Sequence, residues 1–311
     1  MHSEDYALGN GDAPLWTAQA SLLKKVDRLT RGMEQVSTAI PELSLRRYES
    51  PRKPASYMLE QSICLIAQGR KRVVLGEDEY VYDANHFLLT SVDLPVVAQI
   101  IEASPEKPYF GLMLKLDQNE ISQMMVGSHM PSPRQQSASR GIAVSKITMP
   151  VLEIFHRLLN LLDDPEGIPI VGPLIQRELV YRLLVGDQGP RLRQLVKVGS
   201  RSHQIGQAIE WLKNNFDQPL RIADLADRVG MSTSRFHHHF RTMTAMSPLV
   251  FQKRLRLNEA RQLMLTKYMG ASDAAFQVGY ENPSQFSREY SHMFGAPPLQ
   301  DIKNLRKTAS A

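Results

Sequence analysis

The sequence of 311 residues predicts a multidomain α+β protein, in which a small antiparallel β-rich domain with flanking helices precedes an all-α domain. Three observations lead to this fold class. Short β-favouring runs separated by turns fill residues 43–116. Helical spacing of apolar residues dominates from residue 117 onward. The last third contains two copies of one helical pattern, and 42% hydrophobic residues suffice to bury a core.

The elements of the first two thirds follow in order along the chain. Residues 15–36 have the apolar spacing of a helix. The runs within 43–116 are separated by Gly- and Pro-containing turns, as in a small antiparallel barrel or sandwich. Residues 117–185 return to helical spacing, and the Gly-rich, basic segment 186–202 is the predicted linker, in which Leu192, Leu195 and Val196 allow a helical part. The predicted bounds are 1–39 for a helical extension, 40–198 for the first domain and 203–305 for the second.

The last third contains an internal repeat. The dipeptide Val-Gly recurs at an offset of 49, and four further positions recur at an offset of 50. Each copy consists of a helix, a Gly turn, a polar cap and a second helix, which is a helix-turn-helix. The two units are predicted at residues 222–243 and 270–293. The matched positions are Val229-Gly230 with Val278-Gly279, Phe236 with Phe286, Phe240 with Tyr290, Met243 with Met293 and Pro248 with Pro298.

The stretch "SRFHHHF" places three consecutive histidines in the second helix of the first unit. Successive helical residues are rotated by about 100°, so the three rings point in different directions. Ligands on one helix face need a spacing of three or four residues, and the pattern therefore predicts no metal site. His239 falls beside the buried stripe of Phe236 and Phe240, while His237 and His238 face outward.

The second helix of each unit has an outward face that is polar and free of acids. Such a face can enter the major groove, which is about 12 Å wide, and hydrogen-bond base edges. An ordinary exposed helix face, which is the alternative, usually carries Asp or Glu as well. The pattern therefore predicts a DNA-reading face in each unit. These faces hold Ser234, His237, His238 and Arg241 in the first unit, and Ser284, Ser287, Arg288 and Ser291 in the second.

The net charge of +5 is concentrated in the same part of the chain. Residues 203–311 hold 14 Lys and Arg against 9 Asp and Glu, whereas the preceding 202 residues hold 23 of each. A local basic excess suggests a polyanionic partner, but the charge taken alone fits an ordinary solvated surface better. On the helix between the two units, Lys253, Arg254 and Arg256 fit phosphate contacts or a solvated face.

The remaining features predict a soluble cytoplasmic protein without an active site. The first 16 residues lack the pattern of a secretory signal, and no apolar run is long enough to cross a membrane. The single cysteine, Cys64, lies in an apolar strand and is expected to be a buried thiol. His86 is the one histidine of residues 3–128, too few for a metal-binding barrel. No phosphate loop or catalytic dyad is visible, so no enzyme activity, metal or cofactor is expected.

Residues 205–306 resemble the DNA-binding domain of the AraC family of bacterial transcription regulators. The motifs that carry the resemblance are "LADRVGMSTSRFHHHFRTMTAMSPLVFQKRLRLNEARQLM" and "AAFQVGYENPSQFSREYSHMFGAPP". The second contains the family's most specific signature, which stands here as Gly279-Tyr280, then Ser284 to Arg288, then Phe294 to Pro298. The segments "SICLIAQGRKRVVLGEDEYVYDANHFLLTSVDLPVVAQI" and "IPIVGPLIQRELVYRLLVGDQGPRLRQL" are similar to the first domain of one subgroup, so the resemblance covers residues 40–306.

The resemblance implies a fold, a function and partners. It implies a cupin-like β-barrel that senses a small-molecule effector or mediates dimerisation. It also implies a transcription regulator, either an activator or a repressor, that binds double-stranded operator DNA, works with RNA polymerase and can form a homodimer. The alternative is a cupin-type metalloenzyme with a helical extension, which bound metal would reveal. The family's DNA-reading positions fall on Ser234, His237, His238, Arg241, Pro283, Ser284, Gln285, Ser287 and Arg288.

Overall fold

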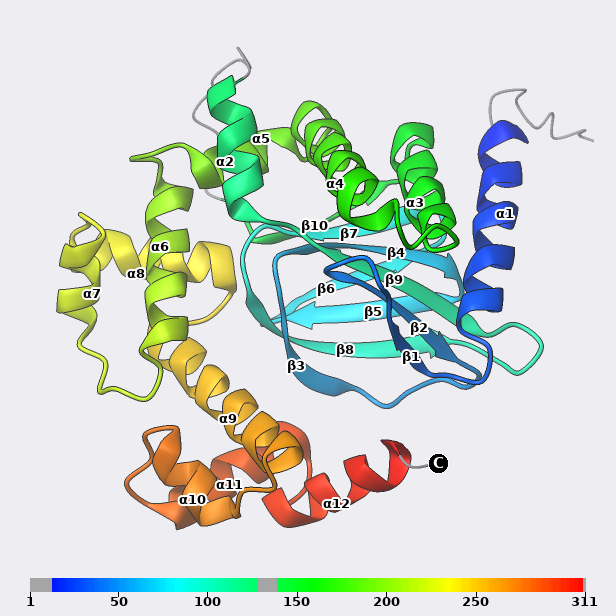
Figure 1. Cartoon of the computed structure of the whole chain (residues 1–311). Coiled ribbons are helices and arrows are strands. Elements are labelled where there is room, and N and C mark those ends of the chain that lie inside the picture. The colour runs from blue at the N-terminus through cyan, green and yellow to red at the C-terminus, as the bar shows by residue number, and fades with distance from the viewer. Residues whose placement is uncertain (1–12, 128–138, 310–311) are drawn as a thin grey trace, which may run out of the picture.

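The computed structural model describes residues 13–127 and 139–309 of the chain. It is a two-part α+β molecule with an amino-terminal domain of two facing β-sheets, the two-sheet domain, and a carboxy-terminal helical domain (Figure 1). Within the described residues, no helix is both long and apolar enough to cross a membrane.

Two antiparallel sheets form the amino-terminal domain. The six-stranded sheet has the order β1-β2-β9-β4-β7-β10, and the four-stranded sheet has the order β3-β8-β5-β6. The sheets face each other and are not joined by strand pairing between described residues, so they form an open sandwich rather than a closed barrel. The strands are β1 Gln35–Ser37, β2 Leu43–Tyr48, β3 Ala55–Leu59, β4 Ser62–Gln68, β5 Arg70–Leu75, β6 Asp78–Asp83, β7 His86–Thr90, β8 Leu94–Glu102, β9 Tyr109–Lys115 and β10 Ile142–Lys146.

Helices cover the outer face of the six-stranded sheet. Successive side chains of a strand point to opposite faces, so each strand of this sheet contributes to two cores. In β2, Leu45 packs toward the helices while Arg46 faces the other sheet. In β4, Ile63 faces the helices and Cys64 faces inward. The helices of this domain are α1 Ala13–Leu29, α2 Gln118–Gly127, α3 Met149–Leu161, α4 Ile168–Val185 and α5 Gly189–Val196.

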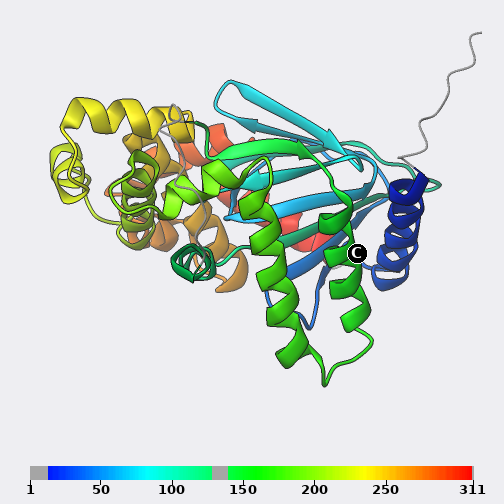
Figure 2. The ribbon, with the colours of Figure 1, turned by 90° about the horizontal axis from the view of Figure 1, so that it is seen from above.

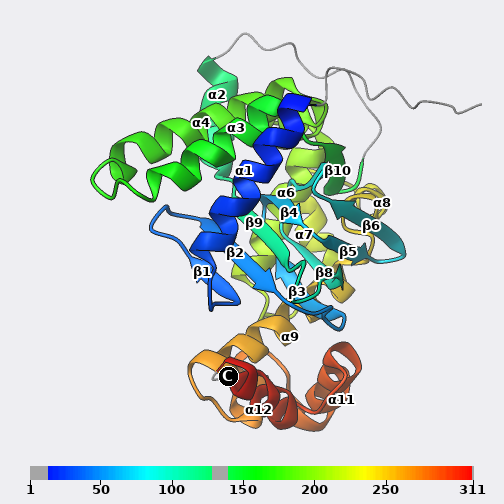
Figure 3. The same ribbon diagram turned by 90° about the vertical axis from the view of Figure 1, so that its right-hand side faces the viewer.

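The helical domain consists of two helix-turn-helix units joined by one long helix. Helices α7 and α8 form the first unit, α10 and α11 form the second, and α9 joins them (Figures 1 and 3). The first unit lies at the end of the sheets opposite to α1 (Figure 2). The helices are α6 Arg201–Asn214, α7 Ile222–Arg228, α8 Thr233–Thr244, α9 Pro248–Thr266, α10 Ala271–Gln277, α11 Pro283–Phe294 and α12 Pro298–Ala309.

The structure differs from the sequence-based expectation in two places. The helix predicted over residues 15–36 ends at Leu29, because Gly32 adopts a left-handed φ of +76° and the chain then joins the sheet as β1. The strand β10 was not predicted, since its pairing with β7 joins distant parts of the chain. The helical part that the sequence allows within the predicted linker is confirmed as α5, which packs through the buried Leu192 and Leu195.

Candidate nucleic-acid interface and inner cavity

In the first unit, helix α8 buries aromatic side chains on one face and exposes its opposite face. Gly230 has a φ of +69° and makes the turn after α7, and Ser232 is the N-cap residue of α8 without a side-chain capping bond. Phe236 and Phe240 are fully buried, with ring centroids 5.5 Å apart. The predicted burial of this stripe is therefore confirmed. The four predicted DNA-reading residues of α8 are all exposed, namely Ser234, His237, His238 and Arg241.

The three consecutive histidines diverge as the helical rotation predicts. His237 and His238 are exposed, whereas His239 is buried with 8% of its surface exposed. Burial, and then the nearby Arg201 and His238 side chains, lower the pKa of His239. Its Nδ1 atom has no hydrogen-bond partner among the described residues. His239 is therefore a neutral ring in the core of the first unit.

The second unit repeats this arrangement with a better capped helix. The Asn282 side chain accepts hydrogen bonds from the backbone N–H groups of Ser284 at 2.8 Å and Gln285 at 3.3 Å. Phe286 and Tyr290 are fully buried, as the repeat predicts. Of the predicted DNA-reading residues, Gln285 also donates to the Glu289 carboxylate at 3.3 Å. Among the predicted DNA-reading residues of this unit, Ser284, Gln285 and Arg288 are exposed. Pro283 and Ser287 are half-buried.

Arg256 of α9 connects the two units from inside the domain. Its guanidinium donates to the carbonyls of Phe216 at 2.6 Å, Asp217 at 3.1 Å, Gln218 at 3.0 Å and Gly279 at 2.9 Å. Phe216 to Gln218 lie in the loop after α6, and Gly279 is the turn of the second unit. Arg256 therefore fixes the turn of the second unit against the loop between α6 and α7, and it is not a phosphate contact in this arrangement.

Gly279 must be glycine for this junction to form. Its φ is +84°, and a Cβ at this position would lie 2.1 Å from the carbonyl oxygen of Asp217. Two further cations of α9, Lys253 and Arg254, also have partners within the protein. Lys253 lies 3.7 Å from Glu289, and Arg254 donates to the carbonyl of Pro95 at 3.3 Å. Sequence reasoning could not identify these roles, since a cation bonded to carbonyls looks like a solvated one.

Arg140, just before β10, holds the carboxy-terminal end of α8. It forms an ion pair with Asp78 and donates to the carbonyls of Arg241 and Thr242, each at 2.8 Å. The backbone N–H of Gly141 donates to the carbonyl of Met243 at 2.9 Å. The last carbonyls of a helix lack partners within the helix and carry negative partial charge, so a cation is favoured there. The two-sheet domain thus caps the predicted DNA-reading helix.

The turn between β5 and β6 contacts the same end of α8. Gly76 at this turn has a φ of +63°, and a Cβ there would lie 2.7 Å from the Cβ of Ala245. Ala245 is the C-cap of α8 and itself adopts a left-handed φ of +60°. The contact is therefore close enough to require a residue without a side chain on the sheet side.

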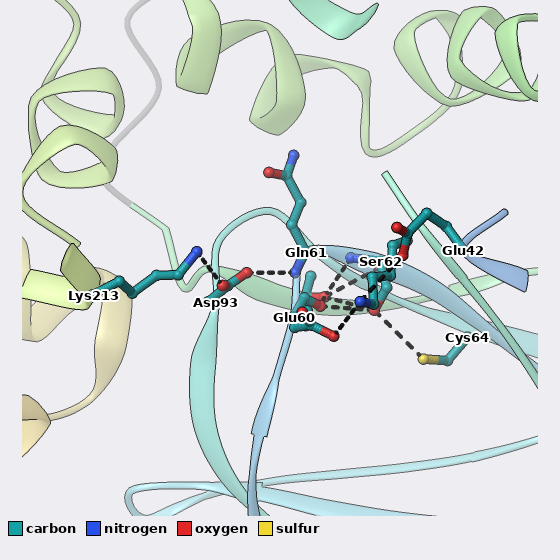
Figure 4. Close-up of polar contacts among 9 residues, drawn as sticks. Glu42, Glu60, Gln61, Ser62, Cys64, Asp93 and Lys213 are labelled. Atoms are coloured by element: carbon teal, nitrogen blue, oxygen red, sulfur yellow. Dashed lines mark hydrogen bonds and ion pairs between the residues drawn. The ribbon is translucent and has the colours of Figure 1, made fainter. Parts of the chain in front are cut away.

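Two further contacts join the domains away from α8. Lys213 of α6 pairs with Asp93 at 2.7 Å, and Asp93 also accepts from the backbone N–H of Gln61 at 2.7 Å (Figure 4). The Ser56 hydroxyl of β3 donates to the carbonyl of Met293, near the end of α11, at 3.3 Å. The two-sheet domain thus contacts both helix-turn-helix units.

A cavity of about 700 Å³ lies between the two sheets, and α9 forms part of its wall. The sheets contribute two cations, Arg46 and Lys71, which sequence reasoning missed although the two-residue period of β2 and β5 places both on the inner face. The cavity wall also contains four tyrosines and the buried thiol of Cys64. Burial raises the pKa of Cys64, and the expectation of a buried thiol is confirmed. The four tyrosines are Tyr48, Tyr57, Tyr82 and Tyr109.

The structure places His86 away from any cluster of metal ligands. Its Nδ1 atom lies 2.8 Å from a carboxylate oxygen of Asp83, one turn before it. Across residues 13–127 and 139–309, no three or more His, Cys, Asp or Glu side chains are grouped so that they could hold a metal ion. His86 therefore caps a turn at the start of β7.

Comparison with known proteins gives matches for both parts of the chain. Residues 39–191 match the family described as AraC-type transcriptional regulator N-terminus, and residues 225–304 match a helix-turn-helix domain family. The HTH-type transcriptional regulator ArgR of Pseudomonas aeruginosa is 27% identical over 160 residues, which are 51% of this chain and 48% of ArgR. The chain thus spans about half the length of the curated relatives it matches.

Solved structures match the fold over most of the chain. Apo ToxT from Vibrio cholerae superimposes with a TM-score of 0.57 at 10% identity, covering 86% of this chain and 98% of ToxT. ToxT with a bound unsaturated fatty acid gives a TM-score of 0.54 at 11% identity, covering 86% and 97%. At such low identity the likeness concerns the fold, a β-rich domain followed by a helical domain with two helix-turn-helix units.

Proposed function

The chain belongs to the AraC family of transcription regulators, and from this premise we propose that it is a sequence-specific DNA-binding regulator controlled by a small molecule. The observation that carries the proposal is the repeated geometry of α8 and α11. Each helix buries one face that carries aromatic side chains and exposes an opposite face that is polar and poor in acidic residues. The local excess of positive charge in the helical domain supports a polyanionic partner.

In this proposal the two helices enter successive major grooves on one side of the duplex. That requires their centres to lie about 34 Å apart along the DNA, and the Arg256 junction would set this spacing. Arg241 and Arg288 would pair with guanines, because a guanidinium matches the two acceptors of that base. The exposed serines, Gln285 and the two exposed histidines would hydrogen-bond neighbouring bases or phosphates.

The cavity between the sheets would hold the effector. Its wall includes Leu255, Asn258 and Gln262 of α9, so a bound molecule would touch the helix that joins the two units. A ligand changes an equilibrium only if it interacts differently with the two states. Contact with α9 provides such a difference. ToxT, which shares the fold, has been solved with a bound unsaturated fatty acid, and this supports a small-molecule effector for the present chain.

Finer properties follow from the family alone. We infer that the open sandwich is a variant of the cupin-like barrel, that the chain has no enzymatic activity, and that it works in the cytoplasm. We infer further that it acts as a homodimeric activator through RNA polymerase. Metal analysis of the purified chain separates this view from a cupin-type metalloenzyme, since stoichiometric iron, manganese or zinc would favour the enzyme.

Selection of DNA from a random library with the full chain tests the main proposal. We expect a motif with two half-sites separated by about one helical turn, 10–10.5 base pairs. Arg241→Ala should relax one half-site and Arg288→Ala the other. Lys303→Ala, an exposed cation of α12, is the matched control and should leave the motif unchanged. Selection that enriches no motif would reject sequence-specific binding.

A further inference from the structure

Two cations from opposite sheets line the cavity between the sheets. Arg46 of β2 alternates with the buried Leu45, and so it points away from the helices and into the cavity. Lys71 of β5 shares its face with the buried Val73 and Leu75. The two positive charges therefore come from opposite sheets and line the same cavity.

Neither cation has an acidic partner. Lys71 donates to the hydroxyl of Tyr57 at 3.1 Å, and Arg46 donates to the hydroxyl of Tyr48 at 3.3 Å. Neither forms an ion pair with any described Asp or Glu. Desolvation lowers the pKa of both cations, but the surrounding phenols, Tyr57 and Tyr109 among them, raise it by more, so both stay charged at neutral pH.

The carboxylates of the cavity wall do not compensate these charges. Glu60 pairs with Lys115 at 2.9 Å, and Asp93 pairs with Lys213 at 2.7 Å. The third, Glu259 of α9, is not among the groups that shift the pKa of Arg46 or Lys71. The cavity is consequently positive in its interior. Withdrawing cations from water without a counter-charge is unfavourable, and a bound anion would remove that cost.

The rest of the cavity wall fits a ligand whose remaining part is apolar and flat. Tyr48 and Tyr109 stack with ring centroids 6.1 Å apart and an interplanar angle of 25°. A Cβ at Gly111 would lie 2.6 Å from the Tyr109 hydroxyl, so this glycine makes room for the ring. Burial raises the pKa of Tyr109 to about 12, which keeps its hydroxyl protonated and able to donate to an anion.

We propose that the cavity binds a small organic anion, with its carboxylate or similar oxoanion between Arg46 and Lys71 and its body against the stacked tyrosines. This inference rests on the proposed function, because it names the chemical class of the effector. It does not depend on DNA binding for its test, so the two can fail separately. Charge-assisted hydrogen bonds from a guanidinium, an ammonium and a phenol would select the anion over an uncharged analogue.

The test uses the full chain and two pairs of probes. One pair has a flat body, 2-naphthoate and 2-naphthylmethanol, and the other has a linear body, decanoate and 1-decanol. Isothermal titration at pH 7.5 without DNA should show at least one acid binding tenfold or more tightly than its alcohol. Lys71→Met and Arg46→Met should each raise the Kd of that acid at least tenfold. They should change the Kd of the corresponding alcohol by less than threefold.

Arg70→Met is the matched control, because Arg70 precedes Lys71 in β5, points outward and lies 3.6 Å from Glu102. It should change neither affinity by more than twofold. The inference is overturned if neither acid exceeds its alcohol on the unaltered chain, a comparison that needs no variant to fold. It is also overturned if Arg70→Met weakens the acid as much as Lys71→Met does. If either result were obtained while the chain still bound DNA selectively, this inference would be wrong and the proposed function would still be supported.

Discussion

Replacing Arg256 by methionine should weaken the helical domain although no predicted DNA-reading residue is touched. The side chain donates to four carbonyls at 2.6 to 3.1 Å, and methionine keeps most of its apolar length. Hydrogen bonds from a charged group contribute about 1.5–3 kcal/mol each, and bonds that share one side chain do not add fully. We therefore expect a loss of about 3 kcal/mol in the free energy of unfolding, roughly a hundredfold in the folding equilibrium.

Urea unfolding followed by tryptophan fluorescence measures this loss. A Trp16→Phe background leaves Trp211 of α6, whose ring lies 5.5 Å from the Arg228 guanidinium, as the reporter of the helical domain. Arg254→Met is the matched control two residues away. Its side chain makes one longer bond, to Pro95, so it should cost about 1 kcal/mol or less. Equal losses in the two variants would refute the role assigned to Arg256.

Three further predictions concern single residues of the helical domain. Arg288→Ala should weaken specific DNA binding by about 1–3 kcal/mol and relax one or two base positions in a gel-shift series, whereas uniform weakening would identify a phosphate contact. Gly279→Ala should lower the stability measured by thermal unfolding by more than the roughly 1–2 kcal/mol expected for Gly295→Ala, because both have positive φ but a Cβ at Gly295 meets nothing within 4 Å. Since burial lowers the pKa of His239 in the fold, the unfolded chain binds its proton first as pH falls below about 6.5. The free energy of unfolding should therefore decrease from pH 7 to pH 5 by up to about 1.4 kcal/mol per pH unit. The urea midpoint of His239→Gln should decrease less over the same pH range than that of the unaltered chain.

Sequence reasoning was strongest where structure depends on local spacing. The repeated Val-Gly turn and the aromatic stripe led to both helix-turn-helix units, because a left-handed glycine and the spacing of buried rings are readable along a few residues. The buried positions Phe236, Phe240, Phe286 and Tyr290 were predicted correctly for this reason. Whether the exposed residues beside them read DNA stays a prediction.

Pairings between distant segments were not accessible in the same way. Strand β10 is short, and what makes it a strand is its pairing with β7. Arg140 and Arg256 bind backbone carbonyls, which every residue has, so no sequence signal marks their partners. The open edges of the two sheets likewise depend on which strands pair. Arg46 and Lys71 are an intermediate case, since strand alternation places each on the inner face but does not bring the two sheets together.

The contact of Gly76, Asp78 and Arg140 with the end of α8 bears on the reuse of this chain in engineered fusions. Chimaeric biosensors are commonly assembled by cutting between a sensing part and a DNA-reading part. Here such a cut would leave Arg140 and Gly141 without the carbonyls they cap, and the Gly76 turn without Ala245. A working fusion would have to take residues 76–78 and 140–141 and the carboxy-terminal turn of α8 from the same parent, so the portable unit is this contact and not either domain alone.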